Sequence, residues 1–391
     1  MEIEDPNKKY HKKTILQVVP ALVSGGVERG TIEIAKYLKA SNYNSIVISA
    51  GGPLVEILNK HDIVHIKLNV NSKNPFIIWR NSKLIGKIIQ KYNVDLIHAR
   101  SRAPAWSCYI AAKSNNKKFI TTFHGIYSIS NFLKKYYNSI MTEGLKIIAV
   151  SNFVKQHIID NYNADESKIE VIHRGVDHNS FDPAKKDEVK LAKFKEKYNV
   201  PKKLPIILLP SRMSSWKGHL ILIEALHKIK HLDFYCIIVG DLSKHPNFTQ
   251  RVGERIAQLK LQSKIQIFGN ETDMLGLYCL ADIVLSTSTQ PEAFGRTIIE
   301  GQAMEKLVIA TNIGGAAETI NDKVTGFHVK VGDSSDLADK LSYCLSILGT
   351  DKQQEIGSAA RASAIKNFSL NSMLSKTIKI YEEVFSNKTN K

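Results

Sequence analysis

The chain has 391 residues, of which 43% are apolar, and it carries a formal net charge of +17. This length is too great for one ordinary core and predicts two domains, while the apolar fraction argues against extensive disorder. The excess charge is +10 up to residue 183 and +7 beyond it, which favours an anionic partner: a nucleotide, a phosphorylated glycolipid, a membrane surface or a nucleic acid.

The first predicted element is a strand at Ile15–Pro20. Basic residues precede an apolar run at 14–23, as in a signal peptide: Lys8, Lys9, Lys12 and Lys13. Pro20 interrupts that run, and the following residues continue into a helical pattern, so we expect a strand and a cytoplasmic protein. Between strand and helix stand Gly25 and Gly26, which let the backbone approach an anion closely.

Strand-like and helix-like segments then alternate, which predicts a parallel sheet with covering helices. The predicted strands are Ile15–Pro20, Asn44–Ser49, Val64–Lys67, Asp95–Ala99, Phe119–Phe123 and Lys146–Ala149. The predicted helices are Val27–Lys39, Pro75–Lys91, Ala103–Lys113 and Asn152–Asp160. His124 follows the strand Phe119–Phe123, and a histidine in that place is either a structural hydrogen-bonding residue or a catalytic group.

A polar, highly charged segment at 177–203, with a short helix around Glu188–Tyr198, is the predicted junction between domains. We place an N-terminal domain at 1–176, a C-terminal domain at 204–368, and at 369–391 a helix and tail that pack back toward the first domain. The second set of strands is Pro205–Pro210, Phe234–Val239, Lys264–Phe268, Ile283–Ser286 and Leu307–Ala310. The second set of helices is Gly218–Ile229, Gln250–Leu259, Asp273–Ala281 and Arg296–Met304.

The predicted fold is α/β, with two Rossmann-like doubly wound domains that face each other across a cleft. Ligands of such folds bind at the carboxyl ends of the strands. Neither set carries Gly-x-Gly-x-x-Gly with an acid about twenty residues further on, which argues against a dinucleotide enzyme. Four widely spaced cysteines predict buried thiols in a reducing compartment, and no apolar run reaches the roughly 18–20 residues that span a bilayer.

Two loops of the second set carry the most informative residues. Arg212 and Lys217 lie in a strand-to-helix turn. The planar guanidinium fork of an arginine and the point charge of a lysine ammonium together suit a diphosphate. Further on, Glu292 and Glu300 stand with seven residues between them, and Gly295 lies in the turn before a helix. The backbone N–H groups of that helix start suit a phosphate, and carboxylates accept hydrogen bonds from vicinal hydroxyls. The pattern predicts a ligand with both sugar and phosphate.

The segment Pro291–Gly301 resembles the Glu-x7-Glu motif of the family 4 retaining glycosyltransferases of the GT-B fold. The segment Ser211–Gly218 matches the Arg…Lys-Gly motif of the same family. The resemblance implies a retaining, hexosyltransferase-type enzyme that moves a sugar from a nucleoside diphosphate to an acceptor hydroxyl. It implies that Arg212 and Lys217 stabilise the departing diphosphate, that Glu292 holds the sugar hydroxyls and that Glu300 holds the ribose.

The resemblance also implies the other members of the site. It places His124 in the cleft near the transferred sugar, so that the catalytic residues are Glu292, His124, Arg212 and Lys217. The glycine-rich loop lies over the phosphates and sugar of the donor, and backbone near Gly269 meets the base. The donor-binding residues are Gly25, Gly26, Arg212, Lys217, Gly269, Asn270, Phe294, Gly295, Thr297 and Glu300. Glu318, in the last recognisable segment of the family, is interpreted as structural.

Three segments of the first domain look like bacterial lipopolysaccharide-core members of the family: His98–Trp106, Thr121–Tyr127 and Tyr136–Ser139. They imply a phosphorylated glycolipid or glycan acceptor and a role in lipopolysaccharide or other cell-surface glycan synthesis. Pro75–Asn93 and Ser130–Met141 mix aromatic with basic residues. Such helices either pack on a sheet or face anionic lipid, which would place the protein peripherally on the inner face of the cell membrane.

Paired aspartates of the Asp-x-Asp kind are absent from the sequence, so we expect a metal-independent enzyme without a cofactor, in which the basic loop balances the diphosphate. Two alternatives stay open. A GT-B sugar-nucleotide epimerase shares the fold, but its resemblance would not include the Arg212 and Lys217 loop joined to the acid pair. A nucleic-acid-binding protein is suggested by charge alone, and no recognisable module supports it.

Overall fold

The structure is a computed structural model that describes residues 12–23 and 25–386. Lys8 and Lys9 of the signal-peptide comparison lie outside these residues. The chain divides into two compact units. Of the described residues, unit 1 contains those up to Val150, Val154–Ile172 and those from Leu374 onward, and unit 2 contains Ser151–Phe153 and His173–Met373. The segment predicted as a junction thus lies in unit 2.

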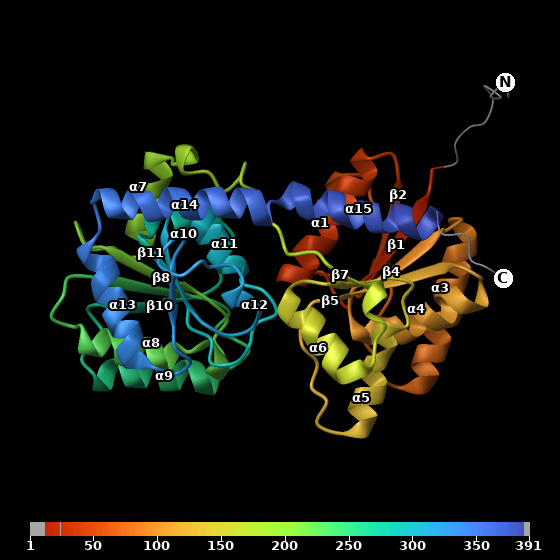
Figure 1. The fold of residues 1–391 in the computed structure, drawn as a ribbon, viewed down its shortest axis with the longest axis horizontal. Helices are drawn as coiled ribbons and strands as arrows, with labels where there is room; N and C mark the ends of the chain where they lie inside the picture. Colours follow the sequence, from red (N-terminus) through yellow and green to blue (C-terminus); the bar gives the residue numbers. More distant parts are fainter. Residues whose placement is uncertain (1–11, 24, 387–391) are drawn as a thin grey trace. The chain divides into compact units, whose positions relative to one another are not determined.

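Unit 1 is built on a seven-stranded parallel sheet in the order β3-β2-β1-β4-β5-β6-β7 (Figure 1). Its strands are β1 (Thr14–Val18), β2 (Asn44–Ser49), β3 (Val64–Lys67), β4 (Leu96–Ala99), β5 (Lys118–Phe123), β6 (Ile147–Ala149) and β7 (Ile169–Val171). The chain builds outward from β1 in one direction and then from β4 in the other. The switch point of this sheet therefore lies between β1 and β4.

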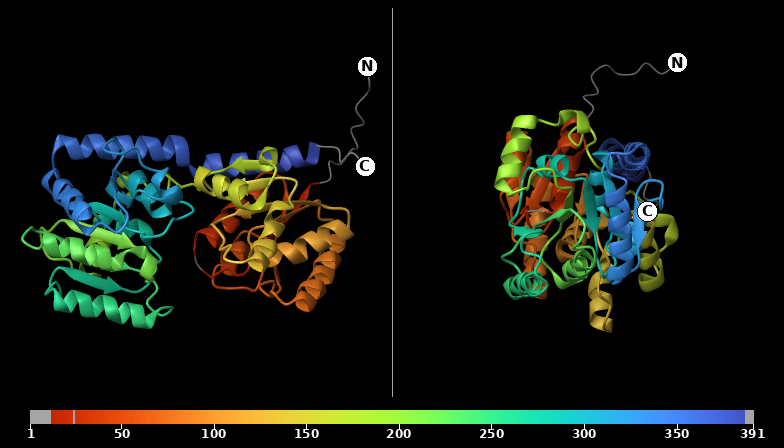
Figure 2. Two further views of the ribbon diagram at one scale, coloured as in Figure 1. Left: turned by 60° about the horizontal axis from the view of Figure 1, so that its bottom comes forward. Right: turned by 90° about the vertical axis from the view of Figure 1, so that its left-hand side faces the viewer.

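Helices cover both faces of this sheet (Figure 2). They are α1 (Gly26–Ala40), α2 (Val55–Lys60), α3 (Pro75–Lys91), α4 (Arg102–Ser114), α5 (Phe132–Ser139), α6 (Asn152–Tyr162), of which Val154 onward belongs to the unit, and α15 (Leu370–Ser386) from Leu374 onward. Short 3₁₀ turns are η1 (Ile140–Thr142) and η2 (Glu166–Lys168). The start of α3 illustrates the local signals: the Asn74 side chain accepts hydrogen bonds from the Phe76 and Ile77 N–H groups, and Pro75 takes the first position.

Unit 2 holds a six-stranded parallel sheet in the order β10-β9-β8-β11-β12-β13. Its strands are β8 (Ile206–Pro210), β9 (Tyr235–Val239), β10 (Ile265–Phe268), β11 (Ile283–Ser286), β12 (Leu307–Thr311) and β13 (Phe327–Val329). The switch point lies between β8 and β11. The fold of each unit therefore confirms the predicted Rossmann-like doubly wound architecture.

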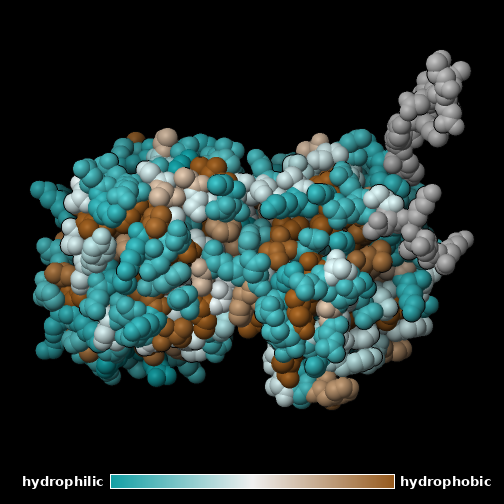
Figure 3. Space-filling view, in the orientation of Figure 1, coloured by the Kyte–Doolittle hydropathy of each residue, from teal (hydrophilic) through white to brown (hydrophobic). Residues whose placement is uncertain are grey.

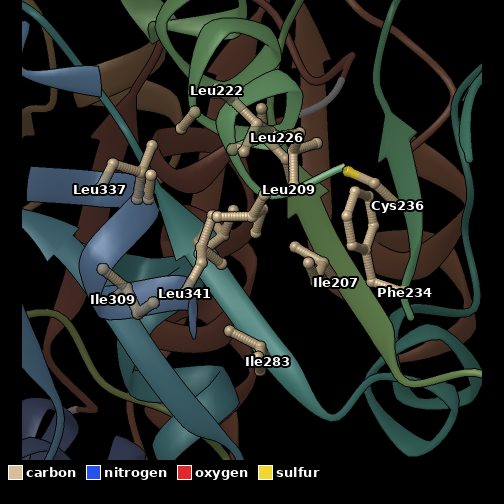
Figure 4. Packing of buried hydrophobic residues seen from close by; sticks show 14 of the residues in the cluster. Ile207, Leu209, Leu222, Leu226, Phe234, Cys236, Ile283, Ile309, Leu337 and Leu341 are labelled. Carbon is tan, nitrogen blue, oxygen red and sulfur yellow. The ribbon is translucent and has the colours of Figure 1, made fainter. Parts of the chain in front are cut away.

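The helices of unit 2 pack on apolar strands. They are α7 (Glu188–Lys197), α8 (His219–Lys228), α9 (Pro246–Gln258), α10 (Met274–Leu280), α11 (Arg296–Ala303), α12 (Gly314–Ala317), α13 (Ser334–Ser346) and α14 (Asp351–Phe368), with 3₁₀ turns η3 (Pro183–Lys185) and η4 (Ser215–Lys217). One core cluster joins strand residues such as Ile207 and Ile283 to Leu222 of α8 and Leu341 of α13 (Figure 4). This packing holds the carboxyl ends of β8 and β11 in place.

Candidate active site

The loops after β8 and β11 lie next to each other at the switch point of unit 2, because these two strands pair directly. The first loop carries Arg212 and Lys217, and the second carries Glu292. In a parallel sheet, a crevice forms outside the carboxyl ends of the strands where the chain reverses its direction of winding. The predicted basic loop and the first predicted acid thus meet at the place where such folds bind ligands.

Lys217 and Glu292 form an ion pair, with 2.7 Å between Nζ and Oε2. Their side chains are only 13% and 16% exposed. The other carboxylate oxygen, Oε1, accepts hydrogen bonds from the hydroxyls of Ser286, at 3.1 Å, and Ser288. Sequence reasoning missed both serines, and the available signal was the Ser-Thr-Ser run at the end of β11.

The surroundings of this pair decide its charge state. Burial opposes ionisation of Glu292, but the Lys217 ammonium and the two serine hydroxyls outweigh it, so the pKa of this carboxyl lies below its ordinary value. Burial lowers the pKa of the Lys217 ammonium, against the opposing effect of Glu292. At neutral pH the site therefore holds a buried carboxylate with a fixed, hydrogen-bonded orientation.

A glycine sets the position of Lys217. Gly218 has a φ of +74°, and a Cβ at this residue would stand 1.8 Å from the carbonyl oxygen of Thr287. The Thr287 hydroxyl donates to the Lys217 carbonyl at 3.0 Å, and the Thr289 N–H donates to the Trp216 carbonyl at 2.7 Å. The loop after β8 is thus attached to the loop after β11 through backbone contacts that leave no room for a side chain at residue 218.

The backbone of Glu292 is held from its other side by the segment after β12. Gly314 pairs with Glu292 in an isolated bridge, and the Gly315 N–H donates to the Glu292 carbonyl at 2.7 Å. A Cβ on Gly315 would stand 2.1 Å from the Ala293 carbonyl oxygen. The two glycines of this segment therefore serve close backbone packing beneath Glu292.

Arg212 is exposed, and its guanidinium lies 5.8 Å from the ring centroid of Trp216. The Lys217 ammonium lies 4.5 Å from the same ring. The indole therefore lies against both cations of the predicted diphosphate pair, an arrangement that favours positive charge at this place. A small cavity of about 60 Å³ is lined by Arg212, Met213, Ser214, Trp216, Asp241, Lys244 and His245.

The second predicted acid, Glu300, lies inside α11 and is 5% exposed. It accepts a hydrogen bond from the Tyr278 hydroxyl at 2.9 Å, and Arg296 lies 3.4 Å from its other oxygen. The helix begins at Arg296, directly after Gly295, and Thr297 lies in its first turn. Phe294 is buried and packs against the rings of His173 and Phe368.

Gly269 and Asn270 follow β10 and are exposed. The next residue, Glu271, has a side chain that is only 7% exposed and pairs with Lys197 at 2.5 Å. Burial would raise its pKa, but hydrogen bonds from Lys197, the Tyr198 hydroxyl and backbone N–H groups lower it to about 2. This carboxylate, which the sequence did not single out, holds the loop after β10 against α7.

Glu318 occupies a structural position. Its carboxylate accepts hydrogen bonds from the backbone N–H groups of Asn152, at 2.9 Å, and Phe153, at 2.6 Å. The Nε2 atom of His173 lies 3.3 Å away. Burial would raise the pKa of Glu318, but these contacts lower it. Its oxygens are thus engaged in backbone capping, as expected from a structural acid.

Three predicted site residues belong to unit 1. Gly25 has a φ of +124° and stands directly before α1, and Gly26 is the first residue of that helix. His124 follows β5 directly and is half-buried. The glycine pair and His124 thus lie at the carboxyl edge of the sheet of unit 1, as predicted. Their catalytic and donor-binding roles stay predictions.

The three segments that resemble lipopolysaccharide-core enzymes come together in unit 1. The Arg102 guanidinium donates to the Asn138 side chain at 2.9 Å and lies 4.8 Å from the ring centroid of Tyr127. The Trp106 indole donates to the Tyr137 carbonyl at 3.0 Å. These contacts join the start of α4 to α5 and to the loop after β5. Within residues 12–23 and 25–386, no helix has the length and apolar character needed to cross a bilayer.

Two family models cover most of the chain. The model described as "Glycosyltransferase Family 4" matches residues 24–180, and the model described as "Glycosyl transferases group 1" matches residues 192–363. Among curated proteins, the N-acetyl-alpha-D-glucosaminyl L-malate synthase of Bacillus anthracis is 24% identical, over 95% of this chain and 97% of its own length. The lipopolysaccharide 1,2-N-acetylglucosaminetransferase of Salmonella typhimurium is 23% identical, over 83% of this chain and 87% of its own.

Solved structures agree with these matches. A glycosyltransferase from Rickettsia africae is 64% identical, with a TM-score of 0.91, and the alignment covers 97% of this chain and 100% of that chain. HepE from Anabaena, in complex with UDP-glucose, is 26% identical, with a TM-score of 0.83, and covers 95% of this chain and 99% of its own. These neighbours favour a glycosyltransferase over the epimerase and nucleic-acid alternatives.

Proposed function

The chain belongs to the family 4 glycosyltransferases of the GT-B fold, and we propose that it transfers a sugar from a nucleoside diphosphate donor to an acceptor hydroxyl with retention of configuration. The observation that carries the proposal is the buried ion pair of Lys217 and Glu292 at the switch point of unit 2. The neighbour that was solved with UDP-glucose supports a nucleotide sugar as the donor.

Breaking the bond between sugar and diphosphate builds negative charge on the departing group and positive charge on the sugar. An ammonium has three N–H donors, so Lys217 can keep Glu292 and still donate to a phosphate oxygen. Arg212 is exposed beside it and offers its planar fork to the same group. Preorganised cations of this kind stabilise charge that develops during the reaction, so no metal ion is needed in the proposed mechanism.

Glu292 is assigned positioning and electrostatics. Its carboxylate is ionised and oriented by Lys217, Ser286 and Ser288, so it can accept hydrogen bonds from sugar hydroxyls and stabilise positive charge on the ring. We assign it no covalent attack. Glu300 is assigned to the ribose by its place in the family motif. The Tyr278 hydroxyl donates to one of its oxygens and Arg296 lies 3.4 Å from the other, and a carboxylate oxygen can accept more than one hydrogen bond.

Calorimetry and kinetics with a panel of nucleotide sugars test the assignment. Glu292→Ala should lower turnover by roughly 10²-fold or more, as removal of one preorganised stabilising group does. Glu300→Ala should weaken nucleotide binding more than it lowers turnover. Glu254→Ala, at an exposed position of α9, is the matched control and should change neither. Near-normal transfer by both site variants, with intact folding, would contradict the assignment, and the anomeric configuration of the product tests retention.

The acceptor is proposed to bind unit 1 and to be a phosphorylated glycolipid or glycan in cell-surface synthesis. The joined segments of α4, α5 and the loop after β5, and the relative that acts on lipopolysaccharide, support this. The exposed face of α5 supports a peripheral position on an anionic membrane. Phe132, Leu133 and Tyr136 are 78%, 74% and 59% exposed, and two lysines lie between them. Apolar side chains gather over α5 at the lower end of unit 1 in Figure 3.

Vesicle binding tests the membrane proposal separately. Each lysine near an anionic surface contributes about 1 kcal/mol, so Lys134→Glu with Lys135→Glu should release most of the protein from anionic vesicles. The matched control is Lys36→Glu with Lys60→Glu, at exposed positions of α1 and α2, and it should stay bound. Binding of the wild type should weaken as salt rises. Equal binding to neutral and anionic vesicles would refute the membrane position and leave sugar transfer untouched.

A further inference from the structure

The sheet of unit 1 has its own switch point, between β1 and β4, and Arg100 stands there. It follows β4 directly, and its backbone N–H donates to the Val18 carbonyl of β1 at 2.9 Å. The corresponding position in unit 2 carries the proposed donor site. Because sheets of this kind bind ligands at the switch point, the chemistry of Arg100 indicates what unit 1 binds.

Arg100 carries a buried positive charge. Its side chain is among the largest that are fully buried, at 1% exposure, and its Nε has no hydrogen-bond partner. Across the part of the chain that the structure describes, no carboxylate lies within ion-pair distance of the guanidinium. Burial lowers its pKa to about 10, while Tyr381 and Glu33 act in the opposite direction.

The histidine near Arg100 on β4 has hydrogen-bond partners of its own. His98 lies two residues earlier on β4, and its ring nitrogens lie 2.7 Å from the hydroxyls of Tyr381 and Thr122. Burial, with Arg100 as a second cause, holds the pKa of His98 well below its ordinary value, so this ring is neutral and adds no charge. This network thus satisfies the histidine, and among the described residues the guanidinium forms no ion pair.

Such an arrangement costs folding free energy. A buried charge is stable when it is paired and hydrogen-bonded, and an apolar residue of similar volume is otherwise neutral or stabilising in its place. A folding role therefore does not account for Arg100. An anionic ligand does, because the free Nε–H and a neighbouring Nη–H form the planar fork that binds two oxygens of one carboxylate or phosphate.

We propose that Arg100 binds an oxyanion, a carboxylate or a phosphate, on the acceptor at the switch point of unit 1. The proposal deepens the proposed function and rests on its assignment of the acceptor to unit 1. The connection from β1 to α1 lies beside Arg100, because β1 and β4 pair directly. It is exposed at Val23 and Gly25.

Isothermal titration of inorganic phosphate, and separately of succinate, into the full chain at constant ionic strength tests the proposal. The protein is first saturated with UDP, and that binding step reports on the proposed donor site by itself. Arg100→Met is compared with Arg80→Met, which removes the same charge from an exposed position of α3. Both variants lose one positive charge and leave unit 2 unchanged. A difference between them therefore reports on the place of the lost arginine, and comparison with the wild type shows whether Arg80 contributes.

We expect at least one of the two anions to bind wild type and Arg80→Met alike, and to bind Arg100→Met at least about tenfold more weakly. Arg100→Lys keeps the charge but loses the fork, and should fall between them. The thermal midpoint of Arg100→Met without anion should equal or exceed that of wild type. Phosphate binding alone identifies a phosphorylated acceptor, and succinate binding alone a carboxylated one. Equal anion binding by both methionine variants, no binding by wild type, or failure of Arg100→Met to fold would overturn the proposal.

Discussion

Removal of one partner from the pair of Lys217 and Glu292 should destabilise unit 2 strongly. Glu292→Gln keeps an amide oxygen that can accept hydrogen bonds from the hydroxyls of the two serines, but it leaves the Lys217 ammonium without its counter-ion. Loss of one partner of a buried pair costs about 3–5 kcal/mol. Because the two side chains are 13% and 16% exposed, we expect the lower end, about 3 kcal/mol.

Urea unfolding measures this loss. In a background with Trp79→Phe and Trp106→Phe, Trp216 is the remaining tryptophan, and its ring lies 4.5 Å from the Lys217 ammonium, so its fluorescence reports on unit 2. With an m-value of about 2–3 kcal/mol per molar urea, the midpoint of Glu292→Gln should fall by about 1–1.5 M. The double variant Glu292→Gln with Lys217→Met should recover at least about 1.5 kcal/mol relative to the sum of the single changes.

The matched control is an exposed pair of the same unit. Lys352 and Glu355 of α14 lie 2.9 Å apart with side chains that are 45% and 67% exposed. Such a pair contributes about 0–1 kcal/mol, so Glu355→Gln should move the midpoint by less than about 0.5 M. If Glu292→Gln moves it no further than the control does, or if the two changes at the buried pair are additive, then the ion pair does not hold these loops together.

Three further predictions concern the same region. The pKa of Glu292 is lowered in the folded state, so its contribution to stability is present above the ordinary carboxyl value of 4.5 and is lost as the pH falls through the folded pKa. The difference in unfolding free energy between wild type and Glu292→Gln should therefore shrink below that pH. A constant difference would contradict the assignment. Gly218→Ala should lower the free energy of unfolding by about 3 kcal/mol or more, because its Cβ would stand 1.8 Å from the Thr287 carbonyl oxygen at a φ of +74°. The control is Gly253→Ala, in α9 with open space around it. In the same urea assay it should be neutral or stabilising by up to about 1 kcal/mol. Sugar transfer should continue in excess chelator, and full loss that magnesium or manganese restores would contradict the metal-independent mechanism.

The sequence by itself determined the alternation of strands and helices and the chemistry of the two informative loops. The strand at Ile283–Ser286 has the same bounds in the prediction and in the structure, because a short apolar run before a turn is a local signal. The resemblance to family 4 glycosyltransferases likewise rested on local motifs around Arg212, Lys217, Glu292 and Glu300. The strands β7 and β13, with three residues each, were not predicted, since so short a run carries too little periodicity.

Only the tertiary structure decided which of these residues meet. Lys217 and Glu292 are distant in the chain, and their pairing depends on β8 and β11 being neighbours in the sheet. Ser286 and Ser288 became part of the site for the same reason. Arg100 looked like any arginine after a strand, because burial and the lack of a partner are properties of its surroundings in space. Local patterns specify elements through backbone geometry, whereas charge pairing and desolvation depend on strand order, which brings distant segments together.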